Sequence, residues 1–477
     1  MKVSDLKPPI CVDLDGALIK TDLLVESFFA LLKKNFALIF LAPFWLIKGK
    51  ANLKHELAQR VEIDVSTLPY QQEFLSYLRE EHAGGRMLLL VTAAHNKFAQ
   101  QIADHLGLFA KVFATNASIN LSGKRKLQRM LLEFGGQSFV YAADAHVDLR
   151  IWLHCRQAIL VNPKLGVTRA AAKLAEVERV FDDRSGGIAA YARAMRLHQW
   201  LKNLLIFVPL LTSHRIGEPE LVVQALVAFL AFGLCASSVY VLNDLLDLAA
   251  DRQHPRKRYR MFAAGRINVL HGALLAPALL LSAFALALAF LPLKFVLVLL
   301  FYYCTTLAYS AQLKNFALID VMVLAGLYTL RVIAGAAAVG VPLSFWLLAF
   351  STFIFLSLAL VKRYSELLVS REQGKDKISG REYEVDDLSV LVSMGAASGY
   401  LAVLVLALYI NSLDVQVLYR QAKWIWLLCP LLLYWISRMW LITHRGNMHD
   451  DPIVFAVRDK VSLTLGVIGL VCVWAAT

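Results

Sequence analysis

The sequence is poor in charged residues, which make up 18% of its 477 residues, whereas hydrophobic residues make up 58%. A soluble domain carries about 25% charged residues. The mean hydropathy is correspondingly high, at +0.56. This composition excludes a disordered or fibrous protein and argues against an enzyme that is soluble throughout.

Cysteine is also scarce. The six cysteines form no CxxC pair, and four of them lie in apolar segments, where cysteine behaves as a small hydrophobic residue. We therefore expect neither a disulfide framework nor a zinc site. We also expect no signal peptide, because Asp13 interrupts the first apolar stretch, and we expect the N-terminal part to stay in the cytoplasm.

The second feature is a series of long apolar segments after Gln199. Most of them approach the roughly 20 residues that span a bilayer, and they predict an all-α polytopic membrane domain with about nine transmembrane helices. The nine segments are 199–213, 221–243, 270–290, 293–311, 318–340, 342–361, 388–410, 424–443 and 460–477.

The loops between these segments predict the orientation in the membrane. The even-numbered loops carry 16 Lys and Arg residues and the odd-numbered loops carry 4. Basic loops stay on the cytoplasmic side, so we expect a bacterial-type inner membrane protein with its N-terminal domain in the cytoplasm and its C-terminus outside. The net charge of +13 therefore reflects membrane orientation, and we expect membrane lipid but no nucleic acid as a partner.

The N-terminal part alternates short apolar runs with helical patterns, which is typical of a parallel α/β sheet. We expect this domain to cover residues 1–187 and the membrane domain to cover residues 188–477, because Asp182–Gly187 is a charged Gly/Ser turn. The predicted strands are Ile10–Leu14, Met87–Val91, Lys111–Ala114, Phe139–Ala142 and Ala158–Val161.

One segment of the N-terminal domain is unusually apolar. Ser27–Ile47, within an insertion near residues 25–50, is apolar, with Lys33 and Lys34 in its middle and Pro43 near its end. Two readings stay open. The segment is either a helical insertion packed against its own domain or an interfacial helix pair on the membrane surface.

Polar residues follow several of the predicted strands. Asp13 and Asp15 end the first strand, where a turn at Gly16 can aim both carboxylates at one crevice, and ligands bind at this edge of open α/β sheets. Two carboxylates there can divide the work of nucleophile and proton shuttle. Thr92 offers a hydroxyl and Lys126 an ammonium, which suit a phosphate. The carboxylates of Asp144 and Asp148 suit Mg²⁺.

This order of residues resembles the haloacid dehalogenase (HAD) superfamily of phosphohydrolases, over about residues 9–185. The resemblance implies a HAD-like Rossmannoid fold, Asp13 as nucleophile and Asp15 as acid/base. It also implies that Thr92 and Lys126 hold the phosphoryl group and that Mg²⁺ binds at the carboxylates Asp13, Asp15, Asp144 and Asp148. The sequence departs from the family at Ala17, where Thr is usual, and at Ala143, where Gly is usual.

A second set of carboxylates closes the second apolar segment, in the run from Asn243 to Asp251. Asp244, Asp247 and Asp251 stand at i, i+3 and i+7, so we expect them on one helical face. Three carboxylates in one stripe repel one another unless cations neutralise them, and hard divalent cations suit carboxylate oxygens. The basic cluster that follows is either an orientation signal or a guide for a polyanionic substrate.

This NDxxDxxxD pattern resembles the UbiA superfamily of intramembrane prenyltransferases, over about residues 191–477. Three further stretches resemble the branch typified by decaprenyl-phosphate phosphoribosyltransferase, which moves a phosphoribosyl group from phosphoribosyl pyrophosphate (PRPP) to a polyprenyl phosphate. They are His198–Asn203, Lys362–Leu367, and Asp450–Pro452 with Arg458–Asp459. Members with aromatic substrates usually carry a second Asp-rich motif where Lys362–Glu366 stands.

The resemblance implies roles for individual residues. Asp244 and Asp247, with Asp251 as a further ligand, would hold Mg²⁺ against the pyrophosphate leaving group. Cations and amides would bind the substrate phosphates. The candidates for substrate binding are Lys202, Asn203, Asn243, Arg331, Lys362 and Arg363.

Three functions stay open. The first is a polyprenyl-phosphate phosphoribosyltransferase with a fused phosphatase that removes the 5-phosphate of the lipid-linked product. The second is a UbiA-type prenyltransferase that joins a prenyl diphosphate to an aromatic or lipid acceptor, and the third is a scaffold or transport protein. The sequence does not give the prenyl chain length, whether the chain forms a homo-oligomer, or whether Ser27–Ile47 enters the membrane.

Overall fold

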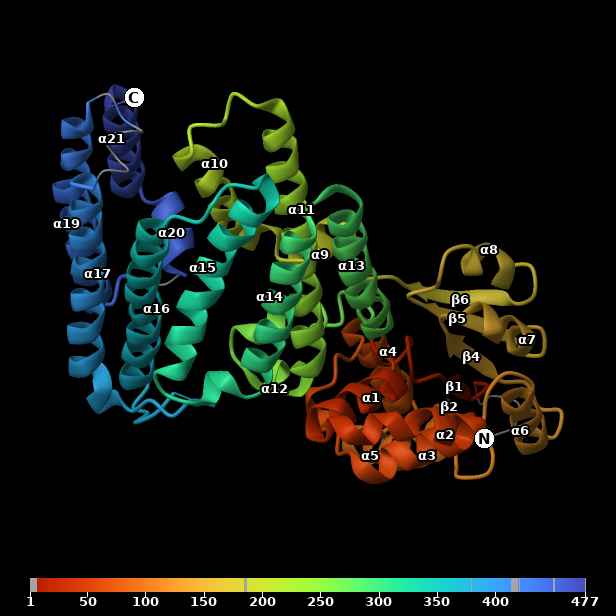
Figure 1. The fold of residues 1–477 in the computed structure, drawn as a ribbon. Helices are drawn as coiled ribbons and strands as arrows, with labels where there is room; N and C mark the ends of the chain where they lie inside the picture. Colours follow the sequence, from red (N-terminus) through yellow and green to blue (C-terminus); the bar gives the residue numbers. More distant parts are fainter. Residues whose placement is uncertain are drawn as a thin grey trace. The chain divides into compact units, whose positions relative to one another are not determined.

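The computed structural model describes residues 7–183, 187–378, 380–412, 419, 421–448 and 451–476. The chain divides into two compact units (Figure 1). The first unit joins Met1–Met195 with Tyr240–Pro277, and the second joins Arg196–Val239 with Ala278–Thr477. The first unit therefore includes the loop between the second and third predicted apolar segments, with the Asp run at its start.

A six-stranded parallel sheet forms the centre of the first unit. Its strand order is β3-β2-β1-β4-β5-β6, which is a doubly wound order. This confirms the predicted α/β fold class. The strands are β1 (Ile10–Val12), β2 (Leu88–His95), β3 (Lys111–Thr115), β4 (Val140–Ala143), β5 (Gln157–Val161) and β6 (Glu176–Phe181).

The inner strands are apolar on both faces because helices cover both sides of the sheet. Ile10 and Val12 belong to one hydrophobic cluster and Cys11 to the other, as the alternation of side chains along a strand requires. All five predicted strands are present. The sixth, β6, was missed because it is an edge strand with alternating charged residues and a mostly exposed surface.

Helices and short 3-10 turns connect the strands and close the first unit. They are α1 (Leu23–Lys34), η2 (Phe36–Leu41), α2 (Ala42–Ile47), α3 (Lys50–Arg60), η3 (Val65–Thr67), α4 (Gln72–Ala83), α5 (Asn96–Leu106), α6 (Lys124–Phe134), η4 (His146–Asp148), α7 (Leu149–Trp152), α8 (Val167–Ala171), α9 (Ile188–Ala194), α12 (Leu248–Gln253) and η6 (Lys257–Tyr259).

The apolar segment Ser27–Ile47 divides into two parts with different surroundings. The first part lies in α1, which buries Phe29 and Leu31 against the domain core. The second part forms η2, which buries none of its residues, and α2, which buries only Trp45. The first reading, an insertion packed against its own domain, therefore fits α1. It does not fit η2 and α2, which have a large exposed apolar surface.

The second unit is helical, and the two long helices α11 (Pro219–Leu246) and α13 (Val269–Phe290) are divided between the units. The other elements are η5 (Leu197–Phe207), α10 (Val208–Thr212), α14 (Leu293–Ala311), η7 (Leu313–Asn315), α15 (Ile319–Val339), α16 (Phe345–Glu372), η8 (Val385–Asp387), α17 (Leu388–Ile410), η9 (Ala422–Leu427), α19 (Leu428–His444), α20 (Pro452–Arg458) and α21 (Lys460–Ala476).

Seven helices in the described part of the chain are long and apolar enough to cross a membrane, or eight if α20 and α21 count as one bent span. The sequence predicted nine. The first segment, 199–213, forms two short elements, η5 and α10, in place of one long helix. The ninth, 460–477, counts as a span only together with α20, from which it is bent by 79°. The chain thus has an α/β region and a helical region with seven or eight candidate membrane spans, which confirms the predicted fold class.

Candidate active sites

The N-terminal carboxylates meet at one edge of the sheet. Asp13 directly follows β1, and Asp144 directly follows β4, which is the parallel neighbour of β1. Asp148 lies one turn further on, in η4. Because neighbouring parallel strands end at the same edge, residues far apart in the sequence come together there.

These three carboxylates suit a metal ion. One oxygen from each of Asp13, Asp144 and Asp148 lies within 4.8 Å of the other two, and this is the one such group of three or more ligands among the described residues. The Tyr141 hydroxyl donates to one oxygen of Asp148 at 2.9 Å, while the other oxygen is buried without a hydrogen-bond partner. A cation at this point would satisfy the unpartnered oxygen, and Mg²⁺ prefers carboxylate oxygens.

Burial raises the pKa of two of these ligands. The pKa of Asp144 rises to about 6 and that of Asp148 to about 7, mainly because both carboxyl groups are removed from water. The ammonium of Lys164, 3.3 Å from Asp144, opposes the first of these shifts. Bound Mg²⁺ would favour the ionised form of both groups.

Asp15 lies outside this group of three ligands, although the sequence analysis also offered it as a metal ligand. Its carboxylate accepts the backbone N–H of Leu23 at 3.1 Å. Burial and, second, the charge of Asp22 raise the pKa of Asp15 well above its ordinary value. A raised pKa favours the protonated carboxyl group, which is the form that can act as a general acid.

The two predicted phosphate ligands have different surroundings. The ammonium of Lys126, from the first turn of α6, lies 2.8 Å from Asp13 and is almost fully buried. Thr92 is fully buried in β2, and its hydroxyl accepts the N–H of Ala94 at 3.0 Å. Lys126 therefore contacts the proposed nucleophile, whereas the Thr92 hydroxyl is engaged by the backbone at the end of β2, where the register with β3 shifts.

A cavity of about 220 Å³ opens beside Asp13 and Asp15. Its wall includes Lys54 from α3, which the sequence analysis did not single out. The Lys54 ammonium donates to the carbonyl of Ala93 at 2.6 Å, and burial lowers its pKa. An isolated lysine in a helical insertion carries no sequence signal for this role. The other lining residues that sequence reasoning missed include Asp22, His95 and Lys164.

The carboxylates at and after the end of α11 do not lie on the one continuous helix that the sequence predicted. The helix ends at Leu246, and α12 begins at Leu248, so Asp247 lies at a break with φ −99° and ψ 10°. Asp247 is about one-third exposed, while Asp244 and Asp251 are buried. The half-buried Asn243 precedes the break, and its carbonyl accepts the Asp247 N–H at 2.9 Å.

Two cations neutralise these carboxylates. The Arg260 guanidinium lies 3.1 Å from Asp244 and 2.7 Å from Asp251. The Lys33 ammonium lies 2.6 Å from Asp247. Asp244, Asp247 and Asp251 do not converge as a group of three metal ligands among the described residues, although their hard carboxylate oxygens are of the type that magnesium prefers. Binding of a divalent cation there would replace these ion pairs.

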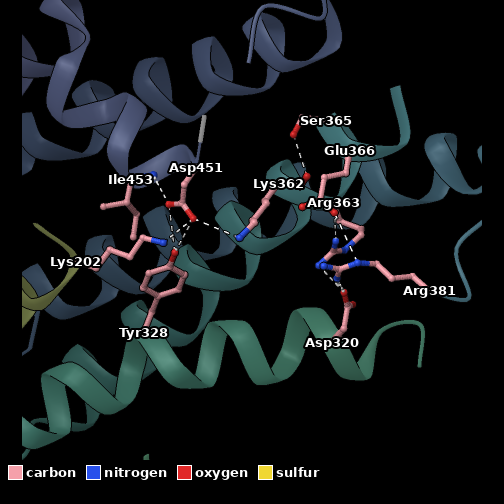
Figure 2. A network of polar contacts seen from close by, with 10 residues as sticks. All are labelled: Lys202, Asp320, Tyr328, Lys362, Arg363, Ser365, Glu366, Arg381, Asp451 and Ile453. Carbon is pink, nitrogen blue, oxygen red and sulfur yellow. Dashed lines mark hydrogen bonds and ion pairs between the residues drawn. The ribbon is translucent and has the colours of Figure 1, made fainter. Parts of the chain in front are cut away.

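In the second unit, two lysines converge on one carboxylate, as Figure 2 shows. The ammonium of Lys202, from η5, lies 2.7 Å from Asp451, and that of Lys362, from α16, lies 3.5 Å from it. The Tyr328 hydroxyl donates to Asp451 at 3.3 Å, and so does the N–H of Ile453. Lys202 and Asp451 are both buried. Asp451 belongs to a motif recognised in the sequence but was not among the predicted site residues, and Asp450, beside it, lies outside the described residues.

Arg363, next to Lys362, belongs to a separate network (Figure 2). Its fully buried guanidinium lies 2.6 Å from Asp320, which also contacts Arg381 at 2.8 Å and accepts the Tyr383 hydroxyl at 2.6 Å. Protein carboxylates therefore already neutralise Arg363, which places it as a support for α16 rather than beside Lys202.

Arg331 and Asn203 contact each other. The Arg331 Nε donates to the Asn203 side-chain oxygen at 3.0 Å, and another guanidinium nitrogen donates to the Tyr302 hydroxyl at 3.2 Å. Both residues are buried. The pair joins η5 to α15 and so fixes the backbone that carries Lys202.

Comparison with known proteins agrees with the two-part organisation. The model of the UbiA prenyltransferase family matches residues 202–470. The uncharacterized protein y4nM of Sinorhizobium fredii is 38% identical over 98% of this chain and 91% of its own length. The nodulation protein NoeC of Azorhizobium caulinodans is 36% identical over 57% of this chain and 88% of its own length.

A third relative is the decaprenyl-phosphate phosphoribosyltransferase of Mycobacterium tuberculosis, which is 35% identical over 39% of this chain. The match spans 63% of that protein.

Solved structures are similar to each part. A UbiA homolog from Archaeoglobus fulgidus bound to GPP and Mg²⁺ covers 59% of this chain and 99% of its own, with 18% identity and a TM-score of 0.46. A HAD family hydrolase from Salmonella enterica covers 37% of this chain and 68% of its own, with 13% identity and a TM-score of 0.27.

Proposed function

Because this chain belongs to the UbiA prenyltransferase family, we propose that its membrane part, residues 188–477, is a transferase that moves a 5-phosphoribosyl group from PRPP to a polyprenyl phosphate. The N-terminal part, residues 1–187, is a phosphatase that removes the 5-phosphate of the lipid-linked product. Both parts use Mg²⁺.

The observation that carries the transferase proposal is the pair of lysines on Asp451. Two ammonium groups around one carboxylate leave a positive charge in a largely buried place, and an anionic phosphate would balance it. Lys362 stands where members with aromatic substrates usually carry a second Asp-rich motif. The similarity to a decaprenyl-phosphate phosphoribosyltransferase supports a phosphorylated polyprenyl acceptor.

The transfer exchanges one bond for another. An oxygen of the polyprenyl phosphate attacks C1 of the ribose, the bond from C1 to the pyrophosphate oxygen breaks, and pyrophosphate leaves with the electron pair. Mg²⁺ held by Asp244 and Asp247 would neutralise the charge that develops on this leaving group. Lys202 and Lys362, whose ammonium groups lie beside Asp451, would bind phosphate oxygens of the substrates.

The phosphatase reaction uses the residues around the N-terminal cavity. A carboxylate oxygen of Asp13 attacks the phosphorus, while Asp15 gives its proton to the departing ribose oxygen. Lys126, 2.8 Å from Asp13, holds the nucleophile and the phosphoryl oxygens together. Asp15 then takes a proton from the water that hydrolyses the aspartyl phosphate.

The proposal also covers the membrane in which the protein lies and its orientation there. The 16 to 4 excess of basic residues in the even-numbered loops supports an N-terminal part on the cytoplasmic face of a bacterial-type inner membrane. If residues 199–213 and the bent pair α20–α21 each cross the membrane, the C-terminus lies outside.

The test is the lipid product. Purified full-length protein is reconstituted with PRPP, polyprenyl phosphate and Mg²⁺, and the lipids are identified by mass spectrometry. We expect polyprenyl-phosphoryl ribose from the wild type and its 5-phosphorylated form from the Asp13→Asn variant. If both accumulate only the phosphorylated form, the sequential mechanism is wrong. If PRPP is not used and a prenyl diphosphate is joined to an aromatic or lipid acceptor, the transferase is an ordinary prenyltransferase.

A further inference from the structure

Within the first unit, one face of α1 contacts the segment that carries the second set of carboxylates. Glu26 and Lys33 stand at i and i+7, two turns apart on the same face of α1. The Glu26 carboxylate accepts two hydrogen bonds from the Arg252 guanidinium, at 2.9 and 2.5 Å. Two turns further on, the Lys33 ammonium lies 2.6 Å from Asp247. The helix thus runs alongside residues 247–252.

The pair Glu26–Arg252 fixes this arrangement. The exposed fractions of the two side chains are only 6% and 5%, the Thr21 hydroxyl donates to Glu26, and the Arg252 Nε donates to the Ala263 carbonyl at 3.2 Å. A buried bidentate pair has one geometry, and removal of either partner leaves a buried charge unpaired. The pair therefore holds α1 in register with the carboxylates.

The loop that follows Arg252 also packs closely against the N-terminal part at Gly265. Gly265 has φ +65°, and a Cβ there would lie 2.7 Å from the Cβ of Lys20, so only glycine fits. The amide of Gln253 adds a hydrogen bond to Asp64 at 3.3 Å. The segment that follows the carboxylates is therefore attached to the N-terminal part at several points.

Lys33 differs from the buried pair because its side chain is 50% exposed and that of Asp247 is 34% exposed. An exposed ion pair contributes little to stability, so this contact is not needed to hold the fold. What matters is the position of the ammonium, which is next to the candidate metal ligand Asp247. When a divalent cation takes the carboxylate, the ammonium is free to bind an anion that the metal attracts.

We propose that Lys33, from the phosphatase part, is a donor-binding residue of the transferase. Its ammonium binds a diphosphate oxygen of the donor, and Glu26 and Arg252 act as a positioning pair that places it there. The inference deepens the proposed function and rests on a donor that carries a diphosphate. It gives the N-terminal part a direct role in the transfer reaction.

The chain offers a matched control for this proposal. Lys34 is the next residue on α1, but its ammonium donates to the carbonyl of Arg60 at 3.0 Å, away from the carboxylates. The experiment measures binding of radiolabelled inorganic pyrophosphate, with saturating Mg²⁺, to the full-length protein in detergent. We expect Lys33→Met to weaken this binding about tenfold, which corresponds to one hydrogen bond between charged groups, and Lys34→Met to leave it unchanged.

Two further variants separate position from charge. Lys33→Arg should restore most of the binding because it keeps a cationic donor. Glu26→Gln should weaken binding less than Lys33→Met does, because it disturbs the position of α1 but keeps the ammonium. Thermal unfolding of each variant verifies that it is folded.

The outcomes distinguish the two proposals. If the wild-type protein binds no pyrophosphate with Mg²⁺, the diphosphate donor of the proposed function is wrong, and this inference falls with it. If the wild type binds pyrophosphate and Lys33→Met binds it equally well, or if Lys34→Met loses as much affinity, only the role of Lys33 is overturned.

Discussion

A single glycine illustrates how closely the backbone and the carboxylates of the phosphatase site are matched. Gly16 has φ +83°, and a Cβ at this position would lie 2.7 Å from a carboxylate oxygen of Asp144. An alanine would therefore strain the backbone and push a proposed metal ligand out of place. The turn between Asp13 and the start of α1 depends on the absence of a side chain.

We accordingly expect Gly16→Ala to reduce phosphate release by roughly tenfold or more, as misplacement of a catalytic group does, while the transferase keeps its rate. The two activities of the full-length variant are compared with those of Gly187→Ala, a glycine with no atom within 4 Å of its added Cβ. Equal phosphatase rates in both variants would contradict the assignment of Asp144.

The raised pKa values of Asp144, about 6, and Asp148, about 7, give the phosphatase site a pH-dependent response to Mg²⁺. In the unfolded chain both groups titrate near 4, so the folded state holds their protons more tightly. Without metal, their contribution to stability therefore declines as the pH rises from about 4 to 7.

Mg²⁺ binds only the ionised carboxylates, so it should raise the unfolding temperature of the full-length protein more at about pH 8 than at about pH 5.5. Asp148→Asn removes one ligand and should lose most of this difference, which separates the N-terminal site from the second set of carboxylates. A magnesium-induced shift that is the same at both pH values would contradict the prediction.

The second set of carboxylates makes a separate prediction at the residue scale. Asp244→Asn and Asp247→Asn should each lower the transfer rate on the order of 10²-fold or more, because each removes charge that would hold Mg²⁺ at the leaving group. The unfolding temperature should change little. Asp104→Asn, on α5 of the N-terminal part, serves as the control, and near-normal turnover by either site variant would contradict the metal assignment.

At the scale of elements, the exposed apolar surface of η2 and α2 stands out. Phe36, Phe40 and Phe44 are between 63% and 66% exposed, and Ile47 is 82% exposed. Lysines lie on both sides of this surface in the sequence. Aromatic residues flanked by cations are typical of segments that lie in a membrane interface.

We expect this surface to lie on the bilayer. A fluorophore on Phe40→Cys, in full-length protein with its exposed Cys304 replaced by serine, should be quenched by brominated lipid in vesicles. A fluorophore on Leu132→Cys, at a position of α6 that is 78% exposed, should not be quenched. Equal quenching at the two positions would show that the apolar surface has no preference for lipid.

The elements also show what the sequence can predict. The strands were predictable because short apolar runs alternate with helical patterns, and Asp13 and Asp144 could be placed together because they follow neighbouring strands. The end of α11 at Leu246 was not predictable, because the run after it contains no glycine or proline. The contacts beside the break join residues 214 and 226 positions apart, and no local pattern encodes them.

At the scale of the whole molecule, the question is why a phosphatase and a transferase share one chain. The proposed intermediate carries a polyprenyl tail, so it stays in the membrane that holds the protein. A phosphatase attached to the transferase meets this intermediate at a high effective concentration. An unattached phosphatase would have to find the same lipid by diffusion in the membrane.

This reasoning predicts that the two activities complement each other only within one membrane. Asp13→Asn retains the transferase, and Asp244→Asn retains the phosphatase. Reconstituted together in the same vesicles, the two variants should make the dephosphorylated product, but more slowly than the wild type because the intermediate must pass between molecules. Reconstituted in separate vesicles that are then mixed, they should make almost none, because the tail prevents exchange. The product is measured by mass spectrometry of the lipids. If it forms equally fast when the variants share vesicles and when they are in separate vesicles, the phosphatase acts on a water-soluble phosphate.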